Sequence, residues 1–393
     1  MTKALRSKAN LCILVPSSFI DNLNEVLLTN TLQRTCSNAH LGTKQLPKIM
    51  MKQYLFFIFC SLSPLFLLSQ VTGGQSTYTF LNLPQSARLT ALGGYQIALA
   101  DVDISLGAQN PALYNPDMHQ QLQVNHNIYF DGINQGSVTY AQHFDSIATT
   151  FAAGIQYISY GKFILTDETG QENGTFSGGE YALNLGASRK YKAFSYGANL
   201  KLIGSHLESY NSFGVALDAG GYYQHPETKF SVGLTFKNIG AQLSTYYGTR
   251  ENLPFDIQLG ISQRLKYLPF RFSIIAHHLH QWNIRYDDPA LQNNNNLFNN
   301  NQGAKEKSYI ADKFFRHFVF NGELYLGKAL MLQVGYNHLR RQELGITAKR
   351  TLTGFSVGAG IRVKRFTFNY GKAFYHAAGG NNHIGLSLNL REW

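Results

Sequence analysis

Cysteine is nearly absent from this chain, and its three copies, Cys12, Cys36 and Cys60, all lie in the first 60 residues. Because the remaining sequence has no thiol, cysteine catalysis, cysteine-ligated metal and a disulfide framework are excluded there. Charge is also scarce, since Asp, Glu, Lys and Arg make up 15% of the residues. Residues 1–69 hold seven Lys/Arg and two Asp/Glu, which leaves 27 against 21 in the rest of the chain. That weak basic excess contains no Lys/Arg cluster of the kind that binds nucleic acid, so we expect no nucleic-acid partner.

Long apolar runs are missing as well. The run at residues 54–68 is interrupted by two serines and a proline, and it is too short to form a membrane-spanning helix. A lysine precedes it and small residues follow it, which predicts a secretory signal peptide at residues 50–69. Since such a signal normally begins a protein, we interpret residues 1–49 as an upstream extension from a misassigned start. The alternative is a genuine but disordered leader.

Glycine (36), tyrosine (23) and phenylalanine (27), by contrast, are abundant, which is typical of a β protein rather than of a helical enzyme. The stretch 354–363 shows why: Phe355, Val357 and Ile361 alternate with glycine, serine and arginine. A period of two residues predicts an extended strand with one apolar face and one small, polar face. The apolar face belongs either to the core of a soluble sandwich or to the lipid-facing surface of a membrane barrel.

The number and length of such segments favour the barrel. About fourteen segments alternate in this way, and most are near the ten residues that a tilted strand needs to cross a bilayer. Their predicted bounds are 121–130, 137–144, 148–159, 180–189, 194–204, 213–223, 230–237, 256–265, 270–277, 317–326, 330–338, 354–363, 366–374 and 383–390.

The connections support the same interpretation, because short links such as 145–147 and 364–365 alternate with longer ones. Short turns at one end and long loops at the other are typical of a bacterial outer-membrane barrel with both termini in the periplasm. The sequence therefore predicts an all-β protein in which residues 121–393 form an antiparallel transmembrane β-barrel of the outer membrane with about 14 strands. The longer links are 160–179, 238–255, 278–316 and 339–353, with shorter members at 131–136, 205–212 and 375–382.

Residues 70–120, which precede the strands, lack this alternation. Short apolar stretches, glycine pairs and Asn-Pro turns predict short helices and loops, which we interpret as a plug in the barrel lumen. A flexible linker is the alternative, and the apolar content, including Phe80 and Leu92, argues against it. The expected lumen-facing positions carry scattered charge: Glu180, Lys201, Asp218, Asp256, Glu323 and Arg362.

Three patterns that could signal chemistry are weak. Residues 159–162 fit S-x-x-K, but they end a strand and have no accompanying K-T-G or S-D-N. Residues 354–358 spell G-x-S-x-G in a strand, where the sharp nucleophile turn cannot form. His277, His278 and His280 could bind a metal, but successive strand residues point to opposite faces and no carboxylate lies at matching spacing. We therefore expect no catalytic residue, no metal and no cofactor.

The segment before the strands contains the most specific motif of the chain, F-L-x-L-P-x-S-A-R. Together with the A-L-G-G and N-P-A motifs that follow, it resembles the amino-terminal signature of the PorQ family, outer-membrane barrels of the type IX secretion system of Bacteroidetes. The resemblance spans residues 73–393. The pattern recurs loosely in the PorV and FadL groups, which are fourteen-stranded with an amino-terminal plug. The signature residues are Phe80, Leu81, Leu83, Pro84, Ser86, Ala87, Arg88, Ala91, Leu92, Gly93, Gly94, Asn110, Pro111 and Ala112.

The resemblance implies a non-enzymatic role. PorQ-like barrels hold a peripheral PorZ protein at the cell surface, in an attachment complex with PorU and PorV that processes secreted cargo and joins it to lipopolysaccharide. On this hypothesis the barrel contacts outer-membrane lipid, its long loops offer the docking face, and Arg88 ties the plug to a lumenal carboxylate such as Asp218 or Asp256. The alternative is a FadL-type channel for hydrophobic small molecules, which predicts an apolar pocket between plug and wall.

Overall fold

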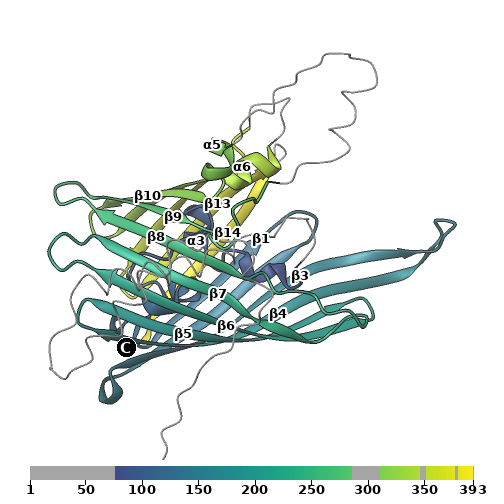
Figure 1. Cartoon of the computed structure of the whole chain (residues 1–393), viewed down its shortest axis with the longest axis horizontal. Coiled ribbons are helices and arrows are strands. Elements are labelled where there is room, and N and C mark those ends of the chain that lie inside the picture. The colour runs from purple at the N-terminus through teal and green to yellow at the C-terminus, as the bar shows by residue number, and fades with distance from the viewer. Residues whose placement is uncertain (1–75, 286–309, 346–350, 377–378, 393) are drawn as a thin grey trace, which may run out of the picture. The chain divides into compact units, whose positions relative to one another are not determined.

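The computed structural model of the chain describes residues 76–285, 310–345, 351–376 and 379–392. The predicted extension and signal peptide, at residues 1–69, lie outside the described residues. Within the described part, fourteen antiparallel strands form a closed barrel (Figure 1).

The barrel is built in chain order, because each strand pairs with the strands before and after it. The ring closes where the first strand pairs with the fourteenth, with Gln121 opposite Asn389. The predicted antiparallel barrel is thus confirmed. Its strands are β1 (Gln121–Ile128), β2 (Asn134–Phe144), β3 (Thr149–Thr166), β4 (Glu172–Tyr191), β5 (Phe194–Leu207), β6 (Tyr210–Gln224), β7 (Ser231–Ser244), β8 (Asp256–Arg264), β9 (Phe270–Ala276), β10 (Phe318–Leu326), β11 (Leu330–Asn337), β12 (Phe355–Val363), β13 (Phe366–His376) and β14 (Gly379–Asn389).

Strand β14 shows how the alternating sequence fixes the two faces of the wall. Ile384 is 54% exposed and points outward, whereas the adjacent His383 is 1% exposed and points into the lumen. The other strands repeat this burial pattern, which leaves a belt of aliphatic and aromatic side chains outside. An apolar exterior around a polar interior is the arrangement of a transmembrane barrel. None of the described helices is long and apolar enough to span a bilayer.

The two ends of the barrel differ in their connections. The links β2–β3, β4–β5, β6–β7, β8–β9, β10–β11 and β12–β13 lie at one end, which we call the turn end. The opposite end, with the links that follow the odd-numbered strands, is the loop end. Its short helices are α5 (Ile310–Phe315), which precedes β10, and α6 (His338–Leu344), which follows β11. At the turn end, η7 (Asp145–Ile147) joins β2 to β3 and η8 (Leu390–Glu392) follows β14.

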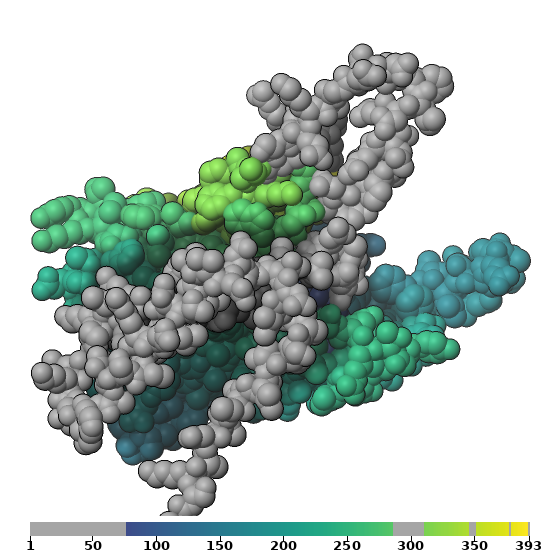
Figure 2. Space-filling view, viewed as in Figure 1, coloured from purple at the N-terminus to yellow at the C-terminus, as the bar shows by residue number. Residues whose placement is uncertain are grey.

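Three predicted loops are wrong, because the strands continue through most of their residues. Residues 160–179 form the outer part of the β3–β4 hairpin, and 205–212 contain only a tight turn between β5 and β6. In the predicted loop 375–382, β13 continues to His376 and β14 begins at Gly379. The predicted link 238–255 is shorter than expected, because β7 continues to Ser244. Short links therefore occur at both ends of the barrel. A strand needs an apolar face only where it crosses lipid. Beyond the membrane, backbone hydrogen bonds can continue the strand pair even though its sequence no longer alternates between apolar and polar residues. The hairpin, coloured blue-teal, projects past its neighbours (Figures 1 and 2).

Residues 76–120, called the inner segment below, run inside the barrel. Most of their side chains are buried, and α3 lies among the strands in Figure 1. This helix contacts β11 to β14, while η5 contacts β4 to β6. Residues 70–75 of the predicted plug lie outside the described residues. The elements are η3 (Thr79–Asn82), α3 (Ala87–Ala91), η4 (Ile104–Ala108), η5 (Pro111–Leu113) and η6 (Pro116–Met118).

Candidate functional site

The signature residues lie in the inner segment and connect it to the wall. Ser86 caps α3: its Oγ accepts hydrogen bonds from the backbone N–H of Leu89 (3.2 Å) and from the hydroxyl of Ser105 (2.8 Å). Just before it, the carbonyl of Pro84 accepts a hydrogen bond from Nε2 of Gln135 in β2 (3.1 Å). The buried serine thus satisfies an otherwise orphaned N–H at the start of the helix.

Small residues on both surfaces let α3 lie directly on the wall. A Cβ atom at Gly371 in β13 would overlap the carbonyl oxygen of Ala87, and a Cβ atom at Gly358 in β12 would overlap the methyl group of Ala91. Atoms that overlap in this way cannot coexist unless the backbone shifts. The alanines of the signature and the glycines of the wall are therefore two halves of one packing interface.

The chain turns sharply after α3, and two signature glycines form that turn. Gly93 and Gly94 have φ values of +77° and +95°, a region that glycine enters without steric cost. The carbonyl of Leu92 accepts a hydrogen bond from Nδ2 of Asn321 in β10 (3.1 Å). The wall therefore pairs with backbone groups that the end of the helix leaves free.

The Asn-Pro-Ala motif anchors the inner segment on the other side of the lumen. Asn110 donates hydrogen bonds from Nδ2 to the carbonyl of Ile97 (2.9 Å) and to that of Gly221 in β6 (3.2 Å). Its Oδ1 accepts a hydrogen bond from the backbone N–H of Ala112 (3.1 Å), and Pro111 begins η5. One side chain thus caps η5 and ties it to the wall.

Arg88 is the charged centre of the site. Its guanidinium forms ion pairs with Glu323 of β10 (2.8 Å), Asp101 (2.9 Å) and Asp103 (3.6 Å). Arg271 of β9 pairs with the same Glu323 (3.3 Å), so five charged groups form one network. Removing one partner from such a buried network leaves a charge uncompensated, at a cost of about 3–5 kcal/mol.

The predicted partners of Arg88 were wrong, although the prediction of a lumenal carboxylate was right. Asp218 binds Lys201 instead (2.7 Å), and Asp256 accepts a hydrogen bond from the backbone N–H of His278 (2.6 Å). The reason is geometric: α3 lies against the β11–β14 part of the wall, whereas Asp218 and Asp256 are on β6 and β8.

An apolar cluster lies toward the loop end of the lumen, between η3 and the wall. The hydroxyl groups at its edge are paired: Tyr160 donates to Glu180 (2.5 Å), Tyr246 donates to Ser205 (2.6 Å), and Tyr78 bonds Ser212. Aromatic rings therefore face the cluster while their polar tips bond the wall. The cluster, called the apolar cluster below, comprises Tyr78, Phe80, Leu81, Ile158, Ala182, Ile203, Ala216 and Leu253, with Leu83, Ile133, Tyr160 and Tyr246 packed against it.

A hollow of about 400 Å³ lies beside this cluster at the loop end. It is bounded by the β3–β4 hairpin and by the ends of β5 and β6. The register of β4 places Phe176 and Gly178 on the same face as the buried Glu180, so the hollow lies on the lumenal side of the hairpin. Its lining, called the apolar hollow below, is Tyr160, Phe163, Phe176, Gly178, Leu207, Glu208 and Tyr210.

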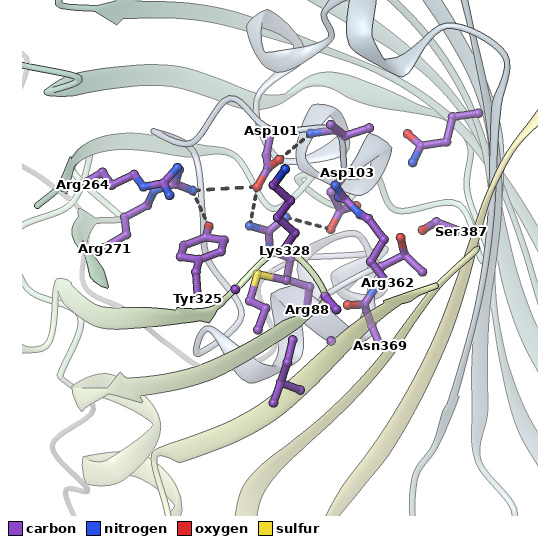
Figure 3. A pocket seen from close by; sticks show the side chains of 18 residues that line it. Arg88, Asp101, Asp103, Arg264, Arg271, Tyr325, Lys328, Arg362, Asn369 and Ser387 are labelled. Carbon is purple, nitrogen blue, oxygen red and sulfur yellow. Dashed lines mark hydrogen bonds and ion pairs between the residues drawn. The ribbon is translucent and has the colours of Figure 1, made fainter. Parts of the chain in front are cut away.

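A second cavity, of about 230 Å³, lies at the turn end (Figure 3). Its walls come from the inner segment and from the turn-end parts of β8 to β14 and β1. It is polar and strongly charged, so the two ends of the lumen offer different environments.

The S-x-x-K, G-x-S-x-G and histidine patterns all lie in or beside strands of the wall. Residues 159–162 are inside β3 and 354–358 run into β12, so neither forms the helix start or sharp turn its motif requires. The buried ring of His277 stacks on Tyr95, with 4.6 Å between ring centroids. Among the described residues, no three His, Cys, Asp or Glu side chains are arranged to hold a metal ion.

No protein-family model and no curated protein matches this chain. Among solved structures, it is similar to TodX, the toluene transporter of P. putida, with a TM-score of 0.50 and 12% sequence identity, over 78% of this chain and 99% of TodX. At this identity the similarity to TodX concerns the fold alone, a closed β-barrel. A FadL homologue from Pseudomonas aeruginosa is also similar, with a TM-score of 0.43 and 10% identity over 78% of this chain and 98% of the homologue.

Proposed function

We propose that this protein is an outer-membrane channel that takes up small apolar molecules from the loop end. One observation supports it above all: the apolar hollow adjoins the buried apolar cluster through Tyr160, which belongs to both. TodX, which shares the fold, is described as a toluene transporter. An uncharged hydrocarbon gains free energy when it leaves water for a surface of this kind.

The anchors of the inner segment suggest which part of it yields to a ligand. Near η3 the segment is held by apolar contacts and by hydrogen bonds between uncharged groups, such as Tyr78 with Ser212, and an apolar ligand replaces the apolar contacts with others of the same kind. Near α3 it is held by Arg88, and displacing that side chain costs about 3–5 kcal/mol. On this proposal η3 moves during uptake while α3 stays on the wall.

The test compares two adjacent residues of the hairpin. Phe176→Asp places a carboxylate in the apolar hollow, whereas Thr175→Asp places one on the opposite face of the same strand. We expect Phe176→Asp to lower the uptake of labelled toluene about tenfold or more in cells without another hydrocarbon channel, because a charge in an apolar site is strongly unfavourable. Thr175→Asp should leave the uptake unchanged.

Two results would contradict this proposal. Equal toluene uptake by cells with either variant would show that the ligand does not pass through the hollow. If cells with the unaltered protein take up toluene no faster than cells without it, the channel function is rejected.

A different observation favours a second candidate function. The inner segment lies inside the lumen with most of its side chains buried, and the β3–β4 hairpin projects beyond the strands beside it (Figure 1). We propose as this second candidate that the loop end docks a PorZ-like surface protein, in an attachment complex with PorU and PorV. Isolating the intact barrel from its own membranes should then recover that partner. A version with residues 163–176 replaced by a short turn should lose it, and recovery of the barrel alone would reject the scaffold.

A further inference from the structure

The turn-end cavity contains more positive than negative charge. Five cationic side chains line it, from Arg88 on the inner segment and from Arg264, Arg271, Lys328 and Arg362 on the wall. Figure 3 shows Arg264 and Arg271 on one side of Asp101 and Arg362 on the other, with Lys328 between them. The carboxylates within the network are Asp101, Asp103 and Glu323. Five cations against three carboxylates leave a local charge of +2.

Three of these cations have no carboxylate partner in the described part of the chain. The carboxylates of the network are engaged by Arg88 and Arg271, and no ion pair there includes Arg264, Lys328 or Arg362. Arg264 instead lies over the ring of Tyr325, 5.1 Å from its centroid, a contact that fixes the guanidinium and leaves its N–H groups available.

The deep wall of the cavity offers unpaired hydrogen-bond acceptors. Gln121 and Asn369 are 7% and 5% exposed, and their amide oxygens have no partner among the described residues. Buried polar atoms in folded proteins normally have a hydrogen-bond partner. The cavity of about 230 Å³ also has more than ten times the ~10–15 Å³ that one water molecule needs. It therefore has room for a ligand that carries both an anion and hydroxyl groups.

We propose that this cavity binds phosphate monoesters of small polyols, which enter from the turn end. The phosphate, with a charge of about −1.5 to −2 at pH 7, matches the local excess of positive charge. Arg264, Lys328 and Arg362 donate to its oxygens, and guanidinium groups suit phosphate because they donate in parallel pairs. The polyol hydroxyls donate to the free oxygens of Gln121 and Asn369. This site is independent of the proposed uptake of apolar molecules, because it occupies the other end of the lumen.

The experiment uses the full chain purified in detergent and isothermal titration calorimetry. Glycerol 3-phosphate should bind saturably, inorganic phosphate more weakly, and glycerol without measurable heat. Arg362→Gln and Lys328→Gln should each weaken glycerol 3-phosphate binding about tenfold, since a charge-assisted contact is lost. Lys364→Gln is the matched control, because Lys364 lies in the β12–β13 turn at the same end but not in the cavity. All three variants should keep the heat resistance of the unaltered barrel.

Several outcomes would overturn the proposal. These are the absence of saturable binding, equal binding of glycerol and its phosphate, and equal effects of Arg362→Gln and Lys364→Gln. A repeat in nanodiscs tests the source of the phosphate. If binding persists in phosphatidylcholine but disappears in phosphatidylglycerol, a lipid headgroup occupies the cavity and the soluble ester is rejected.

Discussion

Arg88 shows how a single residue can hold the inner segment in place. It is 3% exposed, and three carboxylates from two separate parts of the chain converge on it. A buried guanidinium of this kind is stable only with such partners, and they in turn are stable only with it.

Replacing Arg88 with alanine should therefore lower the free energy of unfolding by about 3–5 kcal/mol, because three carboxylates lose their common cation. The measurement is the temperature at which the barrel unfolds in detergent, detected as a change in its electrophoretic mobility. Lys266→Ala, in the exposed β8–β9 turn, is the control and should change stability by no more than ~0.5 kcal/mol. Similar midpoints for both variants would show that the network does not hold the segment.

Part of this network could be predicted from the sequence. The signature includes Arg88, and a cation buried in a lumen needs a carboxylate partner to offset its loss of hydration. The partner could not be chosen, because Glu323 is 235 positions away and sequence does not show which strands α3 contacts. Asp101 and Asp103 follow Arg88 closely in the sequence. Their short spacing from Arg88 was the sequence signal that could have identified them as its partners.

At the scale of elements, the packing of α3 on the wall depends on glycine at defined positions. Gly371→Ala should displace α3 and cost about 1–3 kcal/mol, since the new methyl group would overlap the carbonyl of Ala87. The matched control is Gly221→Ala in β6, where an added methyl group meets nothing within 4 Å. Thermal unfolding in detergent should separate the two variants, and equal midpoints would mean that α3 has space to move.

The tip of the β3–β4 hairpin should respond to acid. The hydroxyl of Thr169 and the backbone N–H of Gln171 donate hydrogen bonds to Asp167 and hold the pKa of its carboxyl below the usual range. Because the folded pKa is lower than the unfolded one, this stabilisation is complete above the unfolded value of about 3.9. It is lost as the pH falls through the folded value.

A spin label on Glu168→Cys tests this expectation. Its mobility should rise as the pH falls through the folded pKa of Asp167. In a chain that also carries Asp167→Ala, the mobility should be high at every pH. A label that is equally mobile in both chains at neutral pH would contradict the prediction.

Element bounds show where sequence patterns end. Strands such as β12, predicted at 354–363 and found at Phe355–Val363, were located well because each crosses lipid and needs two different faces. The hairpin was missed beyond position 160, where backbone pairing alone maintains the strands. The apolar hollow was missed for the same reason, since it is made by parts of the chain that were predicted to be loops.

At the scale of the whole molecule, the orientation across the membrane can be tested with single cysteines. Residues 61–393 contain no cysteine, so an introduced thiol is the only one in that range. We expect Glu168→Cys at the loop end to react with a membrane-impermeant maleimide on intact cells. Lys266→Cys at the turn end should react only after the outer membrane is opened. The reverse pattern would place the loop end in the periplasm.

The class and closure of the fold followed from composition, period and strand number, because a barrel wall imposes the same two-faced pattern on every strand. Residues 70–120 were expected in the lumen, but the contacts and cavities there did not follow, because the contents of the lumen depend on contacts between distant strands and a segment without a repeating pattern. Function depends on those contents, and they include an apolar region at one end and a cationic cavity at the other.

Pairing of β1 with β14 also constrains how the molecule assembles. The seam joins strands more than 250 positions apart, so closing it costs more chain entropy than closing any hairpin, and the intervening hairpins lower that cost by bringing the two strands together. The inner segment is made before any strand. It is therefore present when the hairpins associate around it. A chain truncated before β14 would leave the inner segment on a curved sheet that cannot close.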